Sequence, residues 1–210
     1  MTIHTMAQRS PEWYQIRLGK MTGSAAKDML ATIKSGEAAA RRDLRMRLVC
    51  EELTGQPQGD GFMNAAMERG VDKEPNARND YGFYAGVEVQ EVGFIEHDEL
   101  KAGCSPDGLV GDDGMVEIKC PKSATHLRYL RFGGLESDYN AQVRHNLYIS
   151  GRAWCDLVSW DDRFPTRMQL VVVRMHARLL NLAEYDLALR TFLAEVQTEV
   201  AALKGWEMAS

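Results

Sequence analysis

The sequence predicts an α/β fold with a mixed central sheet and helices on both of its faces. The first indication is the order of the expected elements: helices, then about three antiparallel strands, a pair of helices, two more strands and a closing helix. The second is a hydrophobic fraction of 45% in 210 residues, which allows one sizeable core. No repeat, low-complexity tract or long linker divides the chain, so residues 1–210 are expected to form a single domain.

The helical stretches have apolar residues at intervals of three or four positions. The first helix is expected to begin near Ser24, whose hydroxyl can cap it, and Gly55 is expected to end the second. Pro75 interrupts the pattern of the third and predicts a break or a new first turn there. The expected helices are residues 25–30, 38–53, 62–81, 123–131, 136–149 and 178–204.

Five stretches have the alternation and composition of strands. They are residues 87–95, 101–104, 115–120, 153–160 and 168–174. In the third stretch, Glu117 and Lys119 are two residues apart and therefore share one face. Val116 and Ile118 then face the other side, which should be the core. Asp107 is expected to end a strand at a Pro-Asp-Gly turn, and a hairpin would fold it back beside Glu117.

Asp107, Glu117 and Lys119 have the spacing of a metal-dependent nuclease centre: an Asp, nine residues, then Glu-x-Lys. Mg²⁺ prefers oxygen ligands, and two carboxylates with a substrate phosphate would suit it. The metal would polarise a phosphoryl oxygen and lower the pKa of a bound water, while the ammonium would orient or deprotonate that water. Taken alone, the pattern also fits a solvated hairpin with an ordinary Glu-Lys pair.

The charge of the chain gives a mixed indication about nucleic acid. A net charge of -5 argues against non-specific binding, which depends on Lys and Arg neutralising phosphates. The cations are segregated, however, with arginines gathered in residues 41–47 and further cations between Lys119 and Arg144. Each of these clusters is also what an ordinary solvated face would contain.

The apolar residues and the cysteines bear on where in the cell the protein is expected. No run of about 18 apolar residues is present, so no membrane span is expected, and the polar N-terminal residues lack an apolar signal region. The chain is therefore expected in the cytoplasm. The four cysteines form no C-x-x-C pair and are expected to be reduced and mostly buried.

Four short segments stand out in order along the chain. They are residues 13–24, with W-x-x-x-R-L-G and then T-x-S, residues 70–78, residues 104–121 and residues 141–143. Together they resemble the lambda-exonuclease-type viral recombinases, the alkaline exonucleases within the PD-(D/E)xK nuclease superfamily. The resemblance implies a restriction-endonuclease-like core, which is a mixed central sheet flanked by helices.

The resemblance implies a role for each matching residue of the centre. Asp107 and Glu117 would hold a catalytic Mg²⁺, for which Mn²⁺ would substitute, and the Ile118 carbonyl would be a further ligand. Lys119 would position or activate the attacking water. Glu74 would reach the same centre from its helix and assist a second metal or the nucleophile.

The resemblance also implies contacts with DNA. Gln142 would hydrogen-bond near the scissile phosphate, and Arg17, Ser24 and Ser105 would form a pocket for the 5′-phosphate of a DNA end. Lys34 stands where the family often has an Arg, and Lys lacks the bidentate fork of Arg. From the residues themselves, a helix capped by Ser24 would offer backbone N–H groups and a positive dipole end to an anion.

The implied function is that of a phage or prophage exonuclease in the cytoplasm of a bacterial host. It would degrade the 5′-ended strand of linear double-stranded DNA, prefer a 5′-phosphate and leave 3′ single-stranded tails for recombination by strand annealing. The resemblance further implies a ring-shaped homotrimer around DNA and a single-strand annealing protein as partner. Two alternatives stay open: a PD-(D/E)xK endonuclease, either restriction or junction-resolving, and a non-catalytic DNA-binding recombination scaffold.

His126 and His145 are candidates that the resemblance does not require. Because Mg²⁺ prefers oxygen ligands, we expect both histidines at the surface or facing DNA rather than in a metal site. Trp13 is expected to be a packing residue.

Overall fold

Two four-stranded sheets form the framework of the computed structural model, which describes residues 1–58 and 65–205. The first sheet contains, in spatial order, β1 (Thr2–His4), β3 (Phe94–Glu96), β4 (Ala102–Cys104) and β2 (Met21–Thr22). The second contains β5 (Gly108–Val110), β6 (Gly114–Lys119), β7 (Trp154–Trp160) and β8 (Leu170–His176). The pairs β2–β4 and β6–β7 are parallel and the other pairs are antiparallel, so both sheets are mixed.

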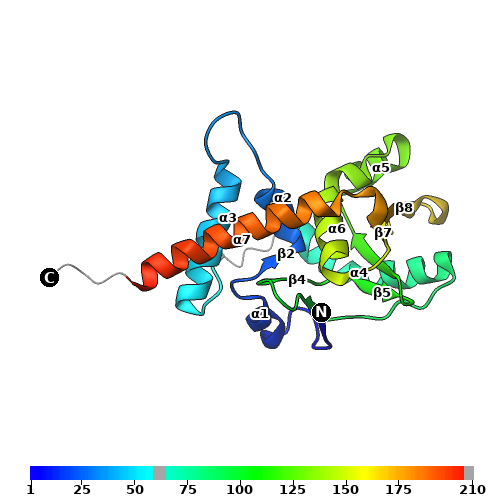
Figure 1. Ribbon diagram of the computed structural model, residues 1–210. Helices are drawn as coiled ribbons and strands as arrows, with labels where there is room; N and C mark the ends of the chain where they lie inside the picture. The colour runs from blue at the N-terminus through cyan, green and yellow to red at the C-terminus, as the bar shows by residue number, and fades with distance from the viewer. Residues whose placement is uncertain (59–64, 206–210) are drawn as a thin grey trace.

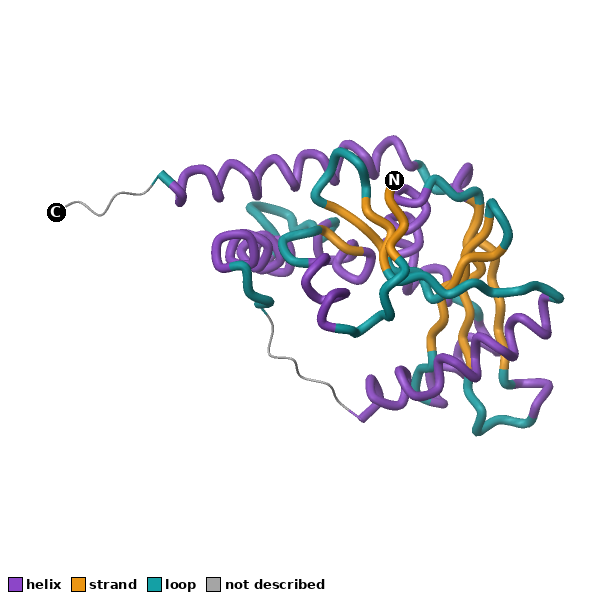
Figure 2. The backbone as a smooth tube through the Cα atoms, turned by 90° about the horizontal axis from the view of Figure 1, so that it is seen from below, coloured by secondary structure: helices purple, strands orange, loops and turns teal. Residues whose placement is uncertain are grey.

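The helices surround these sheets (Figure 1). They are α1 (Pro11–Arg17), α2 (Ala26–Met29), α3 (Ala39–Thr54), α4 (Ala65–Ala85), α5 (Ser123–Phe132), α6 (Leu135–Ser150) and α7 (Leu182–Lys204), with the 3₁₀ turns η1 (Gly23–Ala25), η2 (Thr166–Met168) and η3 (Ala177–Leu179). Figure 2 shows α7 and α4 on opposite sides of the strands.

Both faces of the second sheet are buried. Val116 and Ile118 of β6 pack in a cluster with Ala77 and Tyr81 of α4. On the other face, Met115 belongs to the larger core, to which α3, α6 and α7 contribute. Helices therefore cover both faces of a mixed sheet, which confirms the predicted α/β class and its PD-(D/E)xK core. It also means that the face carrying Glu117 and Lys119 lies under helices rather than in solvent.

Several predicted elements are confirmed with small shifts in their ends. Gly55 ends α3 in the left-handed conformation, with φ of 65°, and its N–H donates to the carbonyl of Glu51. The apolar stripe of the last helix is buried and includes Tyr185, Leu189 and Phe192.

Three predictions of local structure are wrong. Pro75 lies inside the continuous helix α4, because burial of Ala77 and Tyr81 against the sheet holds the helix together despite the missing N–H. Residues 62–64 of the predicted helix lie outside the described residues. Of the predicted strand 87–95, only the end pairs as a strand, at Phe94–Glu96, and Gln90 makes a single bridge to Leu109.

The third wrong prediction concerns Ser24, which lies inside η1 instead of capping a helix. The side chain of Thr22, at the N-cap position of this turn, makes no capping hydrogen bond, and the α-helix that follows has only four residues. Ser24 is therefore not the N-cap residue on which the expected backbone anion site depends.

Two expectations about composition have outcomes here. None of the described helices is long and apolar enough to cross a membrane. All four cysteines are free thiols, with Cys104 and Cys155 buried and Cys50 and Cys120 partly exposed.

Candidate active site

The β5–β6 hairpin brings Asp107 next to β6. Asp107 precedes β5 and does not end a strand, which corrects the predicted position. Its N–H donates to the carbonyl of Val116 (3.1 Å), and its Oδ2 accepts the N–H of Ile118 (2.6 Å). The first bond holds the backbone of Asp107, and the second holds its carboxylate, against the strand that carries Glu117 and Lys119. Asp107 is only 9% exposed.

Glu117 is the centre of a polar cluster beneath α6. Its Oε1 accepts from Lys119 Nζ (2.6 Å) and from Gln142 Nε2 (2.5 Å), while Lys119 also donates to Gln142 Oε1 (3.1 Å). Its Oε2 accepts from Asn146 Nδ2 (2.9 Å). Glu117 is 2% exposed, so these donors replace the water that a carboxylate normally requires.

Asn146 was not among the residues predicted from the sequence. It lies four positions after Gln142, so both amides project from the same side of α6. That spacing was the available signal, but it is common on helices and does not by itself indicate a site.

The electrostatics of the cluster show an excess of negative charge. Burial raises the pKa of Asp107 well above its ordinary value, and the carboxylate of Glu117 raises it further, against the opposing effect of Lys119. Burial alone would lower the pKa of Lys119, but Glu117 and Asp107 outweigh burial and raise it. Two buried carboxylates thus share one ammonium, and the pair is short of positive charge.

Glu74 approaches the same centre from α4. Its charge contributes to the raised pKa of Asp107, as expected of a neighbouring carboxylate. Its own side chain is 12% exposed and pairs with Arg78 (2.7 Å) and Arg9 (3.1 Å). The structure therefore brings Glu74 towards Asp107 but gives it arginine partners of its own.

The donors present suit a hard cation such as Mg²⁺. In the described parts of the chain, no group of three or more His, Cys, Asp and Glu residues is arranged to hold a metal. Mg²⁺ does not require such a cage, because it keeps several waters and takes one or two carboxylates. Asp107 and Glu117 supply those carboxylates, and the raised pKa of Asp107 marks the place where a cation would relieve repulsion.

A second polar group surrounds Ser105. Its Oγ accepts from Trp13 Nε1 (2.9 Å) and from Arg17 Nη1 (3.3 Å), and the Arg17 guanidinium lies 3.8 Å from the centre of the Trp13 ring. Trp13 Nε1 also lies within hydrogen-bond distance of the Gly93 carbonyl, so Trp13 packs in place as expected. The structure thus brings Arg17 and Ser105 together.

Ser24 and Lys34 are not part of this group. Ser24 lies with Gln142 on the wall of a different cavity, and its Oγ is 3.5 Å from Thr22 Oγ1. Lys34 is exposed in the segment between α2 and α3. Within the described part of the chain, no hydrogen bond or ion pair joins either residue to Arg17.

A cavity of about 350 Å³ adjoins Arg17. A second arginine on its wall, Arg47, was not predicted from the sequence to be a site residue. The wall of the cavity also includes Trp13 and Tyr14. Burial lowers the pKa of Arg17 to about 10, and the positive charge of Arg47 contributes to the same effect. The Arg47 Nε is buried, makes no hydrogen bond in the described structure and lies 3.9 Å from Glu51 Oε1. Two guanidinium groups therefore face one cavity, whose wall also includes the Glu51 carboxylate. Guanidinium groups are suited to bind an anion such as a phosphate.

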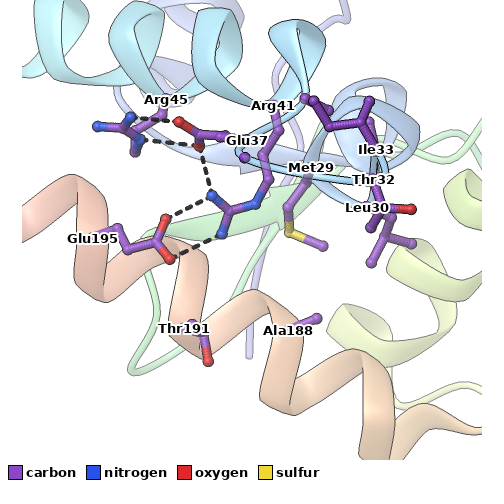
Figure 3. Close-up of a pocket in the computed structure, with 13 residues that line it drawn as sticks. Met29, Leu30, Thr32, Ile33, Glu37, Arg41, Arg45, Ala188, Thr191 and Glu195 are labelled. Atoms are coloured by element: carbon purple, nitrogen blue, oxygen red, sulfur yellow. Dashed lines mark hydrogen bonds and ion pairs between the residues drawn. The ribbon is translucent and has the colours of Figure 1, made fainter.

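The neighbouring arginines of α3 have a different environment, which Figure 3 shows. Arg41 pairs with Glu37 and Glu195, both at 2.7 Å, and Arg45 pairs with Glu37 at 2.8 Å and also with Glu199. These ion pairs join α3 to α7 beside a separate hollow. The arginine cluster seen in the sequence is thus divided. Arg41 and Arg45 make close ion pairs with carboxylates, whereas Arg47 faces the cavity of Arg17 and has Glu51 at 3.9 Å.

The expectation that His126 and His145 lie at the surface is wrong. Both are fully buried. His126 contacts Ser159 Oγ and the Met168 carbonyl, each at 2.8 Å. His145 bonds to the Tyr185 hydroxyl and the Gly103 carbonyl.

Comparisons with known proteins agree with this geometry. Residues 12–153 match the family model described as the YqaJ-like viral recombinase domain. The chain is 40% identical to LHK-Exo, an alkaline exonuclease from Laribacter hongkongensis, with a TM-score of 0.85 over 93% of this chain and 96% of that one. The same values apply to the crystal structure of LHK-Exo in complex with dAMP.

A more distant structure shares the fold. The phage-related exonuclease from Haemophilus somnus 129PT is 13% identical, with a TM-score of 0.67 over 88% of this chain and 94% of that one. Among curated proteins, none matches the chain significantly.

Proposed function

Because the chain belongs to the YqaJ-like viral recombinase family and is therefore a nuclease with a role in recombination, we propose that it is a Mg²⁺-dependent 5′-to-3′ exonuclease. Its substrate would be the end of linear double-stranded DNA, preferably with a 5′-phosphate. Its product would be a 3′ single-stranded tail suitable for strand annealing.

The observation that carries this proposal is the cluster of the buried Asp107 and Glu117 with the partly buried Lys119 and Gln142. A bound Mg²⁺ or Mn²⁺ would supply Lewis acidity and a water of lowered pKa. Since the pKa of Lys119 is raised, its side chain is an ammonium at neutral pH. It would position or activate the attacking water and stabilise negative charge on the phosphate. Gln142, which holds Lys119 and Glu117, would bond near the scissile phosphate.

The selectivity for DNA ends would come from Arg17, Ser105 and Arg47. A terminal phosphate monoester carries more negative charge than an internal diester, and the two guanidinium groups at one cavity match that charge. The crystal structure of LHK-Exo with dAMP, a nucleotide with a 5′-phosphate, supports a product of this class. Ser24 and Lys34 would contact DNA from the neighbouring surface.

The assembly and setting are proposed on the family resemblance. The chain would form a homotrimeric ring around DNA and would work with a single-strand annealing protein. It would be encoded by a phage or prophage and act in the cytoplasm of the bacterial host.

The test uses linear duplex DNA, labelled at either strand end, with and without a 5′-phosphate, beside a closed circular control. We expect Mg²⁺-dependent, stepwise loss of nucleotides from the phosphorylated 5′ end while the circle stays intact. Cutting of the circle would favour an endonuclease of the same superfamily. Absence of cutting on either DNA, with binding retained, would favour a non-catalytic recombination scaffold.

A further inference from the structure

Asn146 is placed to hold the carboxylate at the centre of the candidate site. It is 1% exposed on α6, and its Nδ2 donates to Glu117 Oε2 at 2.9 Å. The other oxygen, Oε1, is held by Lys119 and Gln142. Asn146 is the only hydrogen-bond donor to Oε2 in the described structure. Its removal would therefore leave one side of a buried carboxylate unpaired.

Packing alone does not explain an asparagine at position 146. Its Oδ1 is buried and has no hydrogen-bond partner in the described part of the chain, which costs free energy. A leucine would fill a similar volume without that cost. Among the described residues, the hydrogen bond from its Nδ2 to Glu117 is the only polar contact of this side chain, and it accounts for an Asn at a buried position.

Gly23 of η1 makes room for this side chain. A Cβ built on Gly23 would lie 2.2 Å from Asn146 Oδ1 and 3.4 Å from Gln142 Cγ. Any other residue at this position would push the Asn146 amide away from its place beside Glu117. Gly23, in η1, therefore leaves the space that the Asn146 amide, on α6, occupies beside the Glu117 carboxylate.

We propose that Asn146 is a positioning residue for Glu117 and that Gly23 is the position that admits it. The amide fixes Oε2 so that the carboxylate keeps one orientation towards Asp107. This inference rests on the proposed function, because it assigns Glu117 to the reacting centre. Partners of this kind, which orient a ligand without touching the reactants, affect metal affinity and turnover more than substrate binding.

The test compares Asn146→Leu with Ser150→Ala, which also removes a buried polar group from α6, one turn further on. For Asn146→Leu we expect a fall in kcat of about 10- to 100-fold, with KM for linear DNA changed by less than about twofold. Titration of the free protein with Mn²⁺, followed by electron paramagnetic resonance, should show weaker binding by a similar factor. Ser150→Ala should match the wild type in both measurements.

Unchanged kcat and Mn²⁺ affinity in Asn146→Leu would overturn the proposal. So would equal losses in Asn146→Leu and Ser150→Ala, since these would report general destabilisation. If the wild type itself fails to cut DNA ends, the proposed function is rejected instead. The Mn²⁺ titration would then still compare Asn146→Leu with the wild type.

A second set of variants tests the pairing with Gly23. Gly23→Ala should lower kcat by displacing the amide. Adding Asn146→Ala should relieve the clash and restore thermal stability without restoring kcat. Recovery of kcat in Gly23→Ala/Asn146→Ala would show that Glu117 does not need the amide, and would overturn the proposal.

Discussion

Mild acid is expected to destabilise the protein through protonation of the buried His145. Its Nδ1 is 2.7 Å from the Tyr185 hydroxyl and its Nε2 is 2.9 Å from the Gly103 carbonyl. A carbonyl oxygen only accepts, so Nε2 carries the proton and Nδ1 accepts from Tyr185 in the neutral ring. Burial lowers the pKa of His145 to about 4, from an ordinary value of 6.5.

The size of the effect follows from this pKa difference. The folded protein binds fewer protons at His145 than the unfolded chain between about pH 6.5 and pH 4. The contribution is therefore fully present above the unfolded pKa and is lost as the pH falls through this window. At about 1.4 kcal/mol per pH unit, the free energy of unfolding should fall by about 3 kcal/mol on reaching pH 4. That is a large fraction of the roughly 5–15 kcal/mol that stabilises most domains.

The measurement is urea unfolding followed by circular dichroism, in steps from about pH 7 to about pH 4. Carboxylates also titrate over this range, so the informative quantity is the difference between the wild type and His145→Gln. That variant should start less stable and lose less stability on acidification. His176→Gln, which removes a partly exposed histidine at the end of β8, should keep the wild-type slope. Equal pH dependence in the wild type and His145→Gln would refute the reasoning.

Four further predictions concern the candidate site and its support. Arg17→Ala should lower the preference for 5′-phosphorylated over 5′-hydroxyl ends by about 10- to 100-fold in kcat/KM, because a charge-assisted hydrogen bond to the phosphate is lost. An unchanged preference would contradict the proposal that Arg17 binds the 5′-phosphate. Lys119→Ala should abolish turnover while DNA binding, measured by fluorescence anisotropy, changes by less than about threefold, and equal loss of both would count against its role in catalysis. Chelation should remove activity, and added Mg²⁺ or Mn²⁺ should restore it. The rate should rise towards alkaline pH as the nucleophile deprotonates. Full activity in excess chelator would contradict a metal-dependent mechanism. Asp156 is buried and accepts from the Tyr81 hydroxyl at 2.7 Å, so Asp156→Ala should lower the free energy of unfolding by about 2–4 kcal/mol in urea, against less than about 1 kcal/mol for the exposed Asp43→Ala.

Local patterns in the sequence predicted much of the centre. Residues two apart in a strand share a face, so Glu117 and Lys119 were expected together, and their side chains meet at 2.6 Å. The hairpin that returns Asp107 to β6 and the left-handed end of α3 at Gly55 also depend on neighbouring residues only. Where tertiary packing dominates, local reasoning failed, as at Pro75, which a buried helix face tolerates.

Contacts between distant segments could not be read in this way. Gln142 and Asn146 reach Glu117 across 25 and 29 positions, and only the packing of α6 over β6 brings the two amides to the carboxylate. The burial of His145 and the approach of Arg47 to Arg17 depend likewise on how helices are stacked.

The sequence by itself therefore determined the residues of the candidate catalytic motif, the α/β class and the family, because these follow from short-range spacing and order. Only the tertiary structure decided which polar groups surround Glu117, which histidines are shielded from water and which arginines make close ion pairs with distant carboxylates. Burial, pKa and hydrogen-bond pairing are properties of an environment assembled from remote parts of the chain, and no local pattern encodes them.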